Sequence, residues 1–154
     1  MQLNITTDYA VRIMLYLSMR EGESLITSSE LAEQLVVPRS FLYKIGNKLS
    51  EAGLIVVKPG VNGGYRLARP AETMTLFDVI RVMEQSSYIS RCLEKDAYCS
   101  RCAADHCPVR RFYQGVQEKI EKLFSSISLA ELASDRDHEE WMNAARPSRT
   151  GKIS

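Results

Sequence analysis

Residues 38–67 read PRSFLYKIGNKLSEAGLIVVKPGVNGGYRL, and this stretch decides the fold. Its first half repeats apolar residues at three- and four-residue spacing, which predicts an amphipathic helix with Pro38 in its first turn and Gly53 just past its end. Its second half predicts two short strands, over 54–57 and 65–67, joined by a glycine-rich turn. A helix followed by such a hairpin is typical of the second half of a winged helix-turn-helix.

The residues before this stretch supply the rest of the motif. Apolar residues crowd the segment 8–19 without glycine or proline, which predicts a helix that is buried on more than one side. A shorter helix follows, with Thr27 as its N-cap and Glu30 as the reciprocal partner of a capping box. The tight turn at 36–37 then leads into the helix described above. The fold class that follows is mainly α with a small β-hairpin.

Positive charge is concentrated in the same region. The chain has 154 residues and a net charge of +1, which excludes a polycationic nucleic-acid coater, but 39–69 holds six basic residues and one acidic residue. The exposed helix face can donate to base edges and phosphates, and the hairpin glycines let the backbone approach a sugar-phosphate wall. We therefore predict DNA binding; the alternative is a solvated helix face and a surface hairpin that bind nothing. The predicted contacts are Arg39, Ser40, Tyr43 and Lys44 on the helix, with Lys58 and Arg66 flanking the hairpin turn.

The chain divides into four parts. Residues 1–84 form the winged helix-turn-helix, whose last helix (75–83) is capped by a Thr75–Asp78 pair, and 85–107 lose all periodicity and form a cysteine-rich sensor loop. Residues 108–133 contain a long helix with a coiled-coil type apolar stripe and a short helix capped by Ser128 and Glu131. The stripe predicts a homodimerisation helix, although it could instead pack on the chain's own domain. Residues 134–154 are expected to be a flexible tail, disordered after about Trp141.

All four cysteines, Cys92, Cys99, Cys102 and Cys107, fall within sixteen residues. Clustered thiols in a reducing compartment indicate metal or redox chemistry rather than structural disulfides. A zinc knuckle would use two dipeptide-spaced pairs, and only one such pair is present; the irregular spacing fits an iron–sulfur cluster better. Neighbouring arginines would favour thiolates. A zinc site, a thiol–disulfide switch and free structural cysteines are the alternatives.

Other classes of protein are disfavoured. No run approaches the eighteen apolar residues of a membrane span, and the first residues lack a signal-peptide pattern, so we expect a cytoplasmic protein that does not enter a membrane. His106 and His138 are the only histidines, and no glycine-rich phosphate loop follows a strand. We therefore expect that the chain is not an enzyme.

The sequence resembles the Rrf-two family of winged-helix transcriptional regulators, of the IscR, NsrR and RirA type. The resemblance covers about residues 1–133 and is carried by four stretches: the opening Met1-Gln2-Leu3 with 7–12 (TDYAVR), 38–53, the hairpin 62–67 (NGGYRL) and the cysteine loop. It implies a homodimeric repressor that binds a pseudo-palindromic operator in double-stranded DNA. It also implies a [4Fe–4S] or [2Fe–2S] cluster that senses iron, iron–sulfur supply, nitric oxide or redox state and controls operator affinity.

The resemblance also assigns residues. On the recognition helix it implies DNA contacts at Ser40, Phe41, Tyr43 and Lys44, and on the wing at Asn62, Gly63, Gly64 and Tyr65. The family's usual wing arginine is replaced here by Pro59, so Lys58 takes over its phosphate contact.

The cluster ligands implied by the resemblance are Cys92, Cys99 or Cys102, and Cys107. The family usually has three cysteines in this loop and a further ligand from elsewhere. Three arrangements stay open here: four cysteines, three cysteines with Asp8 from the first helix of the partner subunit, or three cysteines with His106. Asp8 could equally be an ordinary acid near a helix N-terminus.

Overall fold

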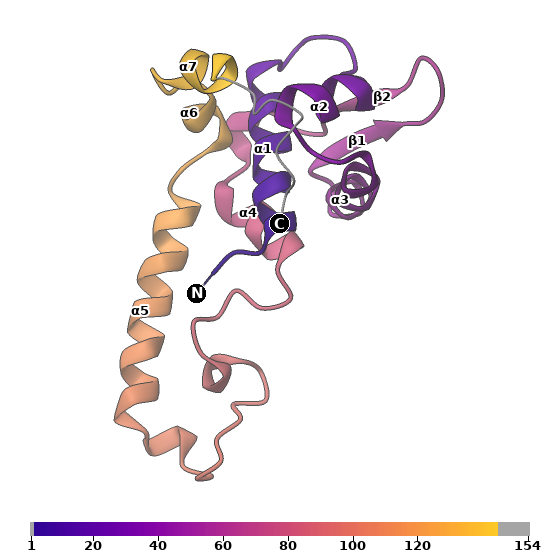
Figure 1. Cartoon of the computed structure of the whole chain (residues 1–154). Coiled ribbons are helices and arrows are strands. Elements are labelled where there is room, and N and C mark those ends of the chain that lie inside the picture. Colours follow the sequence, from indigo (N-terminus) through magenta and orange to yellow (C-terminus); the bar gives the residue numbers. More distant parts are fainter. Residues whose placement is uncertain (1, 145–154) are drawn as a thin grey trace.

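The computed structural model describes residues 2–144. A helical head is built from α1 (Ile5–Met19), α2 (Ser28–Leu35), α3 (Arg39–Glu51), the antiparallel hairpin β1 (Ile55–Lys58) and β2 (Gly64–Leu67), and α4 (Leu76–Met83). The long helix α5 (Pro108–Ser125) stands beside it, followed by α6 (Leu129–Ala133) and α7 (His138–Asn143) (Figure 1). One-turn 3-10 helices occur at Ala71–Thr73, Arg91–Leu93 and Ala104–His106. The predicted fold class, a mainly α winged helix-turn-helix with one hairpin, is confirmed.

Helix α1 is the centre of the head and contacts α2, α3, α4, α6 and β2. Ala10 and Met14 are fully buried, and no residue from Asp8 to Arg20 is exposed, as the crowding of apolar residues predicted. The helix begins earlier than predicted because the Asn4 side chain accepts a hydrogen bond from the Thr7 N–H at 3.0 Å and caps it.

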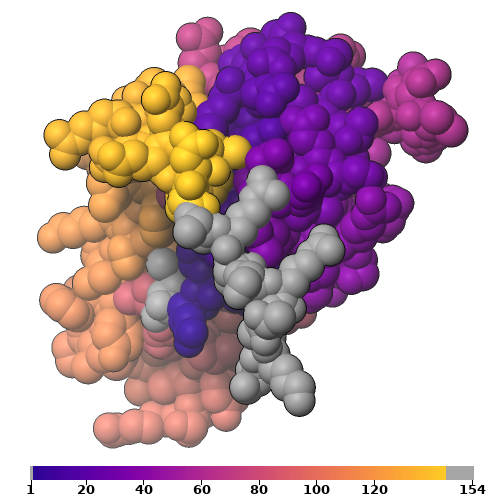
Figure 2. All heavy atoms as spheres, turned by 45° about the horizontal axis from the view of Figure 1, so that its top comes forward, coloured from indigo at the N-terminus to yellow at the C-terminus, as the bar shows by residue number. Residues whose placement is uncertain are grey.

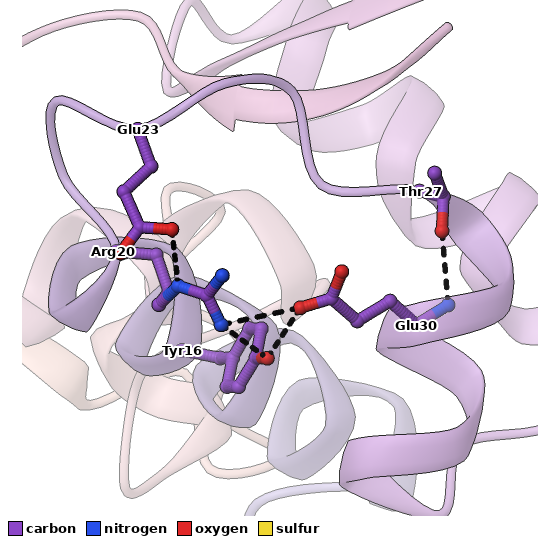
Figure 3. A network of polar contacts seen from close by, with 5 residues as sticks. All are labelled: Tyr16, Arg20, Glu23, Thr27 and Glu30. Carbon is purple, nitrogen blue, oxygen red and sulfur yellow. Dashed lines mark hydrogen bonds and ion pairs between the residues drawn. The ribbon is translucent and has the colours of Figure 1, made fainter. Parts of the chain in front are cut away.

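The capping box predicted for α2 is only half present. The Thr27 hydroxyl accepts a hydrogen bond from the Glu30 N–H at 3.2 Å, as expected. The Glu30 carboxylate does not reciprocate, because it accepts a 2.7 Å hydrogen bond from the Tyr16 hydroxyl and pairs with Arg20 at 3.3 Å (Figure 3). Burial of Tyr16, together with Glu30, raises the pKa of its phenol to about 12. Arg20 also pairs with Glu23 at 2.6 Å, so this network holds the loop that connects α1 to α2.

The start of the recognition helix and the start of the first strand each differ from the prediction by one residue. Pro38 is not the first helical residue but the N-cap of α3, with a ψ of 138° that no helical residue adopts. Gly53 has a φ of +72° and ends the helix as predicted. Strand β1 starts at Ile55 rather than Leu54, because the Leu54 N–H is bonded to the Leu49 carbonyl at 2.9 Å.

Helix α5 returns the chain to the head through α6. Leu129 is fully buried against the head, and its N–H donates to the Met74 carbonyl at 2.9 Å. Both capping boxes predicted from the sequence, Thr75 with Asp78 and Ser128 with Glu131, are present. Helix α7 lies in the segment predicted to be flexible from residue 134, so that prediction missed it; residues 145–154 lie outside the described part of the chain.

Candidate functional site

Helix α3 separates its side chains into two faces. Leu42, Ile45 and Leu49 are buried in the core. The opposite face is open to solvent, where Tyr43 is 61% exposed. The other exposed side chains of α3 are polar and can all hydrogen-bond; they are Arg39, Ser40, Lys44, Asn47 and, in the last turn, the acidic Glu51. Helix α3 therefore presents a continuous row of donors, with its N-terminal residue Arg39 bound to Ser29 Oγ of α2 at 2.7 Å.

The hairpin projects from the head as a wing (Figures 1 and 2). Lys58 and Arg66 are exposed on its two strands, and Asn62 and the fully exposed Val61 lie at its tip. Gly63 is required in this turn, because a Cβ there would lie 2.0 Å from the Lys58 carbonyl oxygen. The tip can thus approach a partner closely through its backbone.

Two residues that the resemblance assigned to DNA contact are packing residues in this structure. Tyr65 is only 5% exposed: its backbone pairs in both directions with Ile26, and its ring lies so close to Gly46 of α3 that a Cβ there would meet it at 2.8 Å. Phe41 is half-buried, with its ring edge-to-face on Tyr9 of α1 at 5.3 Å. Gly64 is buried as well. The Tyr65 and Phe41 side chains thus pack against α3 and α1 within the head, and their assignment to DNA contact stays a prediction.

The cysteine segment leads into the N-terminal end of α5, which is the end that lies away from α6 (Figure 1). Two side chains of α5 hold its first half. Gln117, 5% exposed, accepts a hydrogen bond from the Ile89 N–H at 3.0 Å and donates to the Ser87 carbonyl at 3.1 Å. Arg110 Nε donates to the Cys92 carbonyl at 2.9 Å. The segment up to Cys92 is therefore clamped along α5.

All four cysteines are free thiols. Cys107 is the N-cap of α5, where its Sγ accepts a hydrogen bond from the Arg110 N–H at 3.4 Å. Cys92 Sγ lies 3.3 Å from Ser90 Oγ. Backbone N–H groups of Ala103 and Arg101 lower the pKa of Cys99 and outweigh the opposing effect of burial. Cys102 is exposed, in a left-handed conformation with a φ of +51°.

The predicted metal ligands are not assembled into one site. Within residues 2–144, no three His, Cys, Asp or Glu side chains converge on a point that could hold a metal ion. The nearest approach to a site is one turn of chain, in which the Cys102 N–H donates to the Cys99 carbonyl at 2.9 Å. His106 is exposed directly before Cys107, and Asp8 lies in the head, paired with Arg12 at 2.5 Å. Asp8 therefore does not meet the thiols of its own chain.

The family model described as "Rrf2: Iron-dependent Transcriptional regulator" matches residues 3–135. The chain belongs to the Rrf2 family. This is the Rrf-two family of the sequence resemblance, and its members are transcriptional regulators rather than enzymes. Part of the chain is also similar to protein aau3 of Rhizobium meliloti (strain 1021), with 44% identity over 92 residues, which are 60% of this chain and 59% of that protein.

Two solved structures extend the likeness of this Rrf2 regulator. The structure of CymR (YrzC), the global cysteine regulator of B. subtilis, matches with a TM-score of 0.72 and 24% identity over 87% of this chain and 97% of that one. T. potens IscR matches with a TM-score of 0.69 and 26% identity over 96% of this chain and 94% of the other.

In this Rrf2 chain, none of the helices among the described residues is long and apolar enough to cross a membrane.

One face of α5 is left without a partner in this Rrf2 regulator. Phe112 is 69% exposed and Leu123 is 62% exposed, and Val109 and Tyr113 are exposed beside them. These residues belong to the apolar stripe that the sequence identified. Phe112 and Leu123 lie on a different side of α5 from Arg110 and Gln117, which face the cysteine segment, and Tyr113 lies between the two sides. The stripe is thus free to pack against another molecule.

Glu84, directly before the cysteine segment, connects the end of α4 to the start of α1, a role that sequence reasoning missed. It ends α4, and its carboxylate accepts hydrogen bonds from the Asn4 N–H at 3.0 Å, the Asn4 side-chain amide at 2.9 Å and the Thr7 hydroxyl at 2.5 Å. Burial raises the pKa of Glu84, but these hydrogen bonds and the nearby Lys48 outweigh it and leave that pKa below its ordinary value. No local sequence signal predicts these contacts, because Glu84 binds residues 77 to 80 positions away and Gln117, besides its neighbour Glu121, binds residues 28 to 30 positions away.

Proposed function

We propose that this Rrf2 regulator is a homodimeric repressor that binds a pseudo-palindromic operator in double-stranded DNA and whose operator affinity is controlled by an iron–sulfur cluster. The observation that carries the proposal is the connection of two parts. A winged head with an exposed row of donors on α3 is joined through α4 and α5 to a segment that holds every thiol of the chain.

The proposed DNA interface consists of α3 in the major groove and the wing beside it. The side chains that reach bases or phosphates are Arg39, Ser40, Tyr43, Lys44, Lys58, Asn62 and Arg66, and Gly63 contributes its backbone. Phe41, Gly64 and Tyr65 support this surface from beneath.

The homodimer is proposed to form along the α5 stripe. A stripe with Phe112 and Leu123 largely exposed would favour association with a second copy of the same helix. A two-fold dimer would also place two recognition helices on one duplex, which a pseudo-palindromic site requires.

The cluster is proposed to bind to Cys92, Cys107 and one or both of Cys99 and Cys102. Where only three cysteines bind, the further ligand is Asp8 of the partner subunit or His106 of the same chain. The donor chemistry fits, because four free thiols lie in one segment and Cys99 has a lowered pKa. Cluster binding requires the segment after Cys92 to rearrange so that its thiols approach one another, since no three donors converge in the described residues. A bound cluster supplies a redox-active, oxygen- and nitric-oxide-sensitive group, while Arg110 and Gln117 hold the Cys92 arm in place.

Anaerobic purification tests this proposal. A brown protein with thiolate-to-iron charge-transfer absorbance, and different operator affinities of the loaded and metal-free forms in a gel shift, is the expected result. Cys107→Ala should abolish the absorbance while leaving the metal-free protein folded. A colourless protein, or a Cys107→Ala variant with a full cluster, would contradict the ligand assignment.

A second candidate is a regulator without a cluster, which uses zinc or a reversible disulfide. The observation in its favour is the Cys99–Cys102 turn, in which only two residues separate a thiol of lowered pKa from an exposed one. Stoichiometric zinc in the anaerobically purified protein, or a mass loss of two hydrogens on mild oxidation that Cys102→Ser prevents, would favour this candidate.

A further inference from the structure

A polar hollow of about 440 Å³ lies beside the recognition helix, between the start of α1, one side of α3 and the end of α4. Three parts of the chain, far apart in sequence, line it. Its lining residues are Asn4, Thr6, Lys44, Lys48, Met83, Glu84, Gln85 and Ser86. Of these, only Lys44 was predicted as a DNA contact.

The hollow has a cationic wall. Lys44 and Lys48 lie one helical turn apart on α3, and within residues 2–144 neither side chain forms an ion pair or a hydrogen bond. Two ammonium groups this close repel each other unless an anion lies near them. The acid in the hollow, Glu84, already accepts three hydrogen bonds and offsets only one of the two charges. The hollow therefore keeps a net positive charge.

Hydroxyl groups complete the lining. Thr6 and Ser86 lie on different walls. The Thr6 hydroxyl donates to none of the described residues, and Ser86 Oγ only accepts, from the Tyr88 N–H at 3.3 Å. Each hydroxyl thus has a hydrogen to donate. Ammonium and hydroxyl donors around one hollow are the groups that proteins use to bind phosphate oxygens.

The position of the hollow indicates which phosphate group of the duplex it binds. Helix α3 packs against β1 on one side and against α4 and α1 on the other, so the wing and the hollow flank it. A helix in the major groove has a sugar-phosphate backbone on either side of it. We propose that the hollow binds a phosphodiester of the second backbone, through Lys44, Lys48, Thr6 and Ser86, while the wing contacts the first. This inference rests on the proposed DNA-binding function.

The site would also couple the two parts of the molecule. Gln85 and Ser86 directly follow α4 and are the first residues of the cysteine segment. One wall of the phosphate site therefore belongs to the segment that carries the thiols. A shift of that segment changes a DNA contact directly, without any movement of the recognition helix.

The test uses the full-length protein and a duplex that the wild-type protein selects from a random library. Because a homodimer places two such sites on one duplex, Lys48→Gln should reduce the slope of log Kd against log salt by about 1.8, so that the loss of affinity between 50 and 200 mM salt becomes about 12-fold smaller. Ser86→Ala should weaken binding at every salt concentration without changing the slope. Arg136→Gln is the charge-matched control, since Arg136 is an exposed cation between α6 and α7, and it should change neither quantity.

Neutral methylphosphonates placed one at a time along the duplex locate the contact. At one position per half-site, the substitution should weaken wild-type binding more than the binding of Lys48→Gln, which keeps only Lys44, Thr6 and Ser86 at that phosphate. If every position affects both proteins equally, or if Lys48→Gln keeps the wild-type slope, the proposal is overturned. A hollow that binds only free inorganic phosphate, seen as shifted Ser86 and Lys48 resonances without an effect on the duplex, would also overturn it. A wild-type protein that selects no duplex would contradict the proposed function itself.

Discussion

At the scale of single residues, Tyr65 holds the wing against the recognition helix, because its buried ring occupies the space left by the missing side chain of Gly46. The contact links β2 to the middle of α3. The position of the wing relative to the groove-facing residues therefore depends on a glycine inside a helix, where glycine is otherwise unfavourable.

Gly46→Ala should destabilise the protein by about 1–3 kcal/mol, because the new methyl group would overpack the Tyr65 ring and force it to shift. Urea unfolding measures the change. Gly115→Ala in α5 is the matched control: it has the same gain in helix propensity, and nothing lies within 4 Å of the new Cβ. It should be neutral or stabilising. Equal midpoints for the two variants would show that the Tyr65 contact does not constrain the head.

Glu84 makes stability depend on pH at one joint of the head. Its pKa is lower in the folded protein than in the unfolded chain, so its contribution is present above the unfolded value of about 4.3 and is lost as the pH falls through the lowered pKa. Wild type should therefore unfold at higher urea than Glu84→Gln at pH 7, with the difference shrinking toward pH 3. Glu118→Gln removes an exposed carboxylate without a described hydrogen bond and should track wild type. A constant difference between wild type and Glu84→Gln at all pH values would contradict this account.

At the scale of elements, α5 uses two of its sides: one holds the cysteine segment by hydrogen bonds and the other carries an exposed apolar stripe.

Leu123→Glu should raise the dimer dissociation constant at least about tenfold, because burying a leucine contributes about 1.5–3 kcal/mol and a buried carboxylate is costly. Sedimentation at several concentrations measures the change. The far-ultraviolet spectrum should stay the same, because Leu123 is 62% exposed in the single chain. Glu118→Gln on the opposite face should sediment as wild type does, and a Leu123→Glu variant that remains dimeric would exclude the stripe as the interface.

Elements whose signals are local were predictable from the sequence. The Thr75 and Ser128 capping boxes and the left-handed Gly53 depend on residues within one turn, and all three are where the pattern placed them. The errors arise where a distant partner competes for a side chain. Glu30 binds Tyr16 from another helix instead of its own N-cap, and no local pattern distinguishes a tyrosine that reaches DNA from one that fills a core.

The candidate site was predictable in part for the same reason. Charge and glycine content located the α3 face and the wing, and cysteine spacing located the thiol segment. Its connections to the rest of the fold, through Gln117 and Glu84, join residues far apart in sequence and emerge only from the tertiary structure.

At the scale of the whole molecule, the cysteine segment is held by a few polar contacts and the head by a continuous core. When the metal-free protein is digested with trypsin, the first cut within residues 5–133 should fall after Lys95 or Arg101. Both residues are exposed and lie in a segment that has no long helix or strand. The two fragments should remain associated, since α6 docks on α1. Mass spectrometry of timed digests identifies the cut. Replacing both residues by Gln should slow it, and a first cut in the wing would contradict the difference in local stability.

Within residues 2–144, the buried apolar side chains that form the core of the head include none from residues 84–128. The buried apolar core of the head thus contains no side chain of the thiol segment or of α5, although α5 packs beside α4. Natural selection can exchange the sensing chemistry, adding or losing a cysteine, while the DNA-reading architecture is inherited unchanged. One ancestral head can therefore give rise to regulators that answer to different signals, and the fourth cysteine of this chain is the kind of change that such freedom permits.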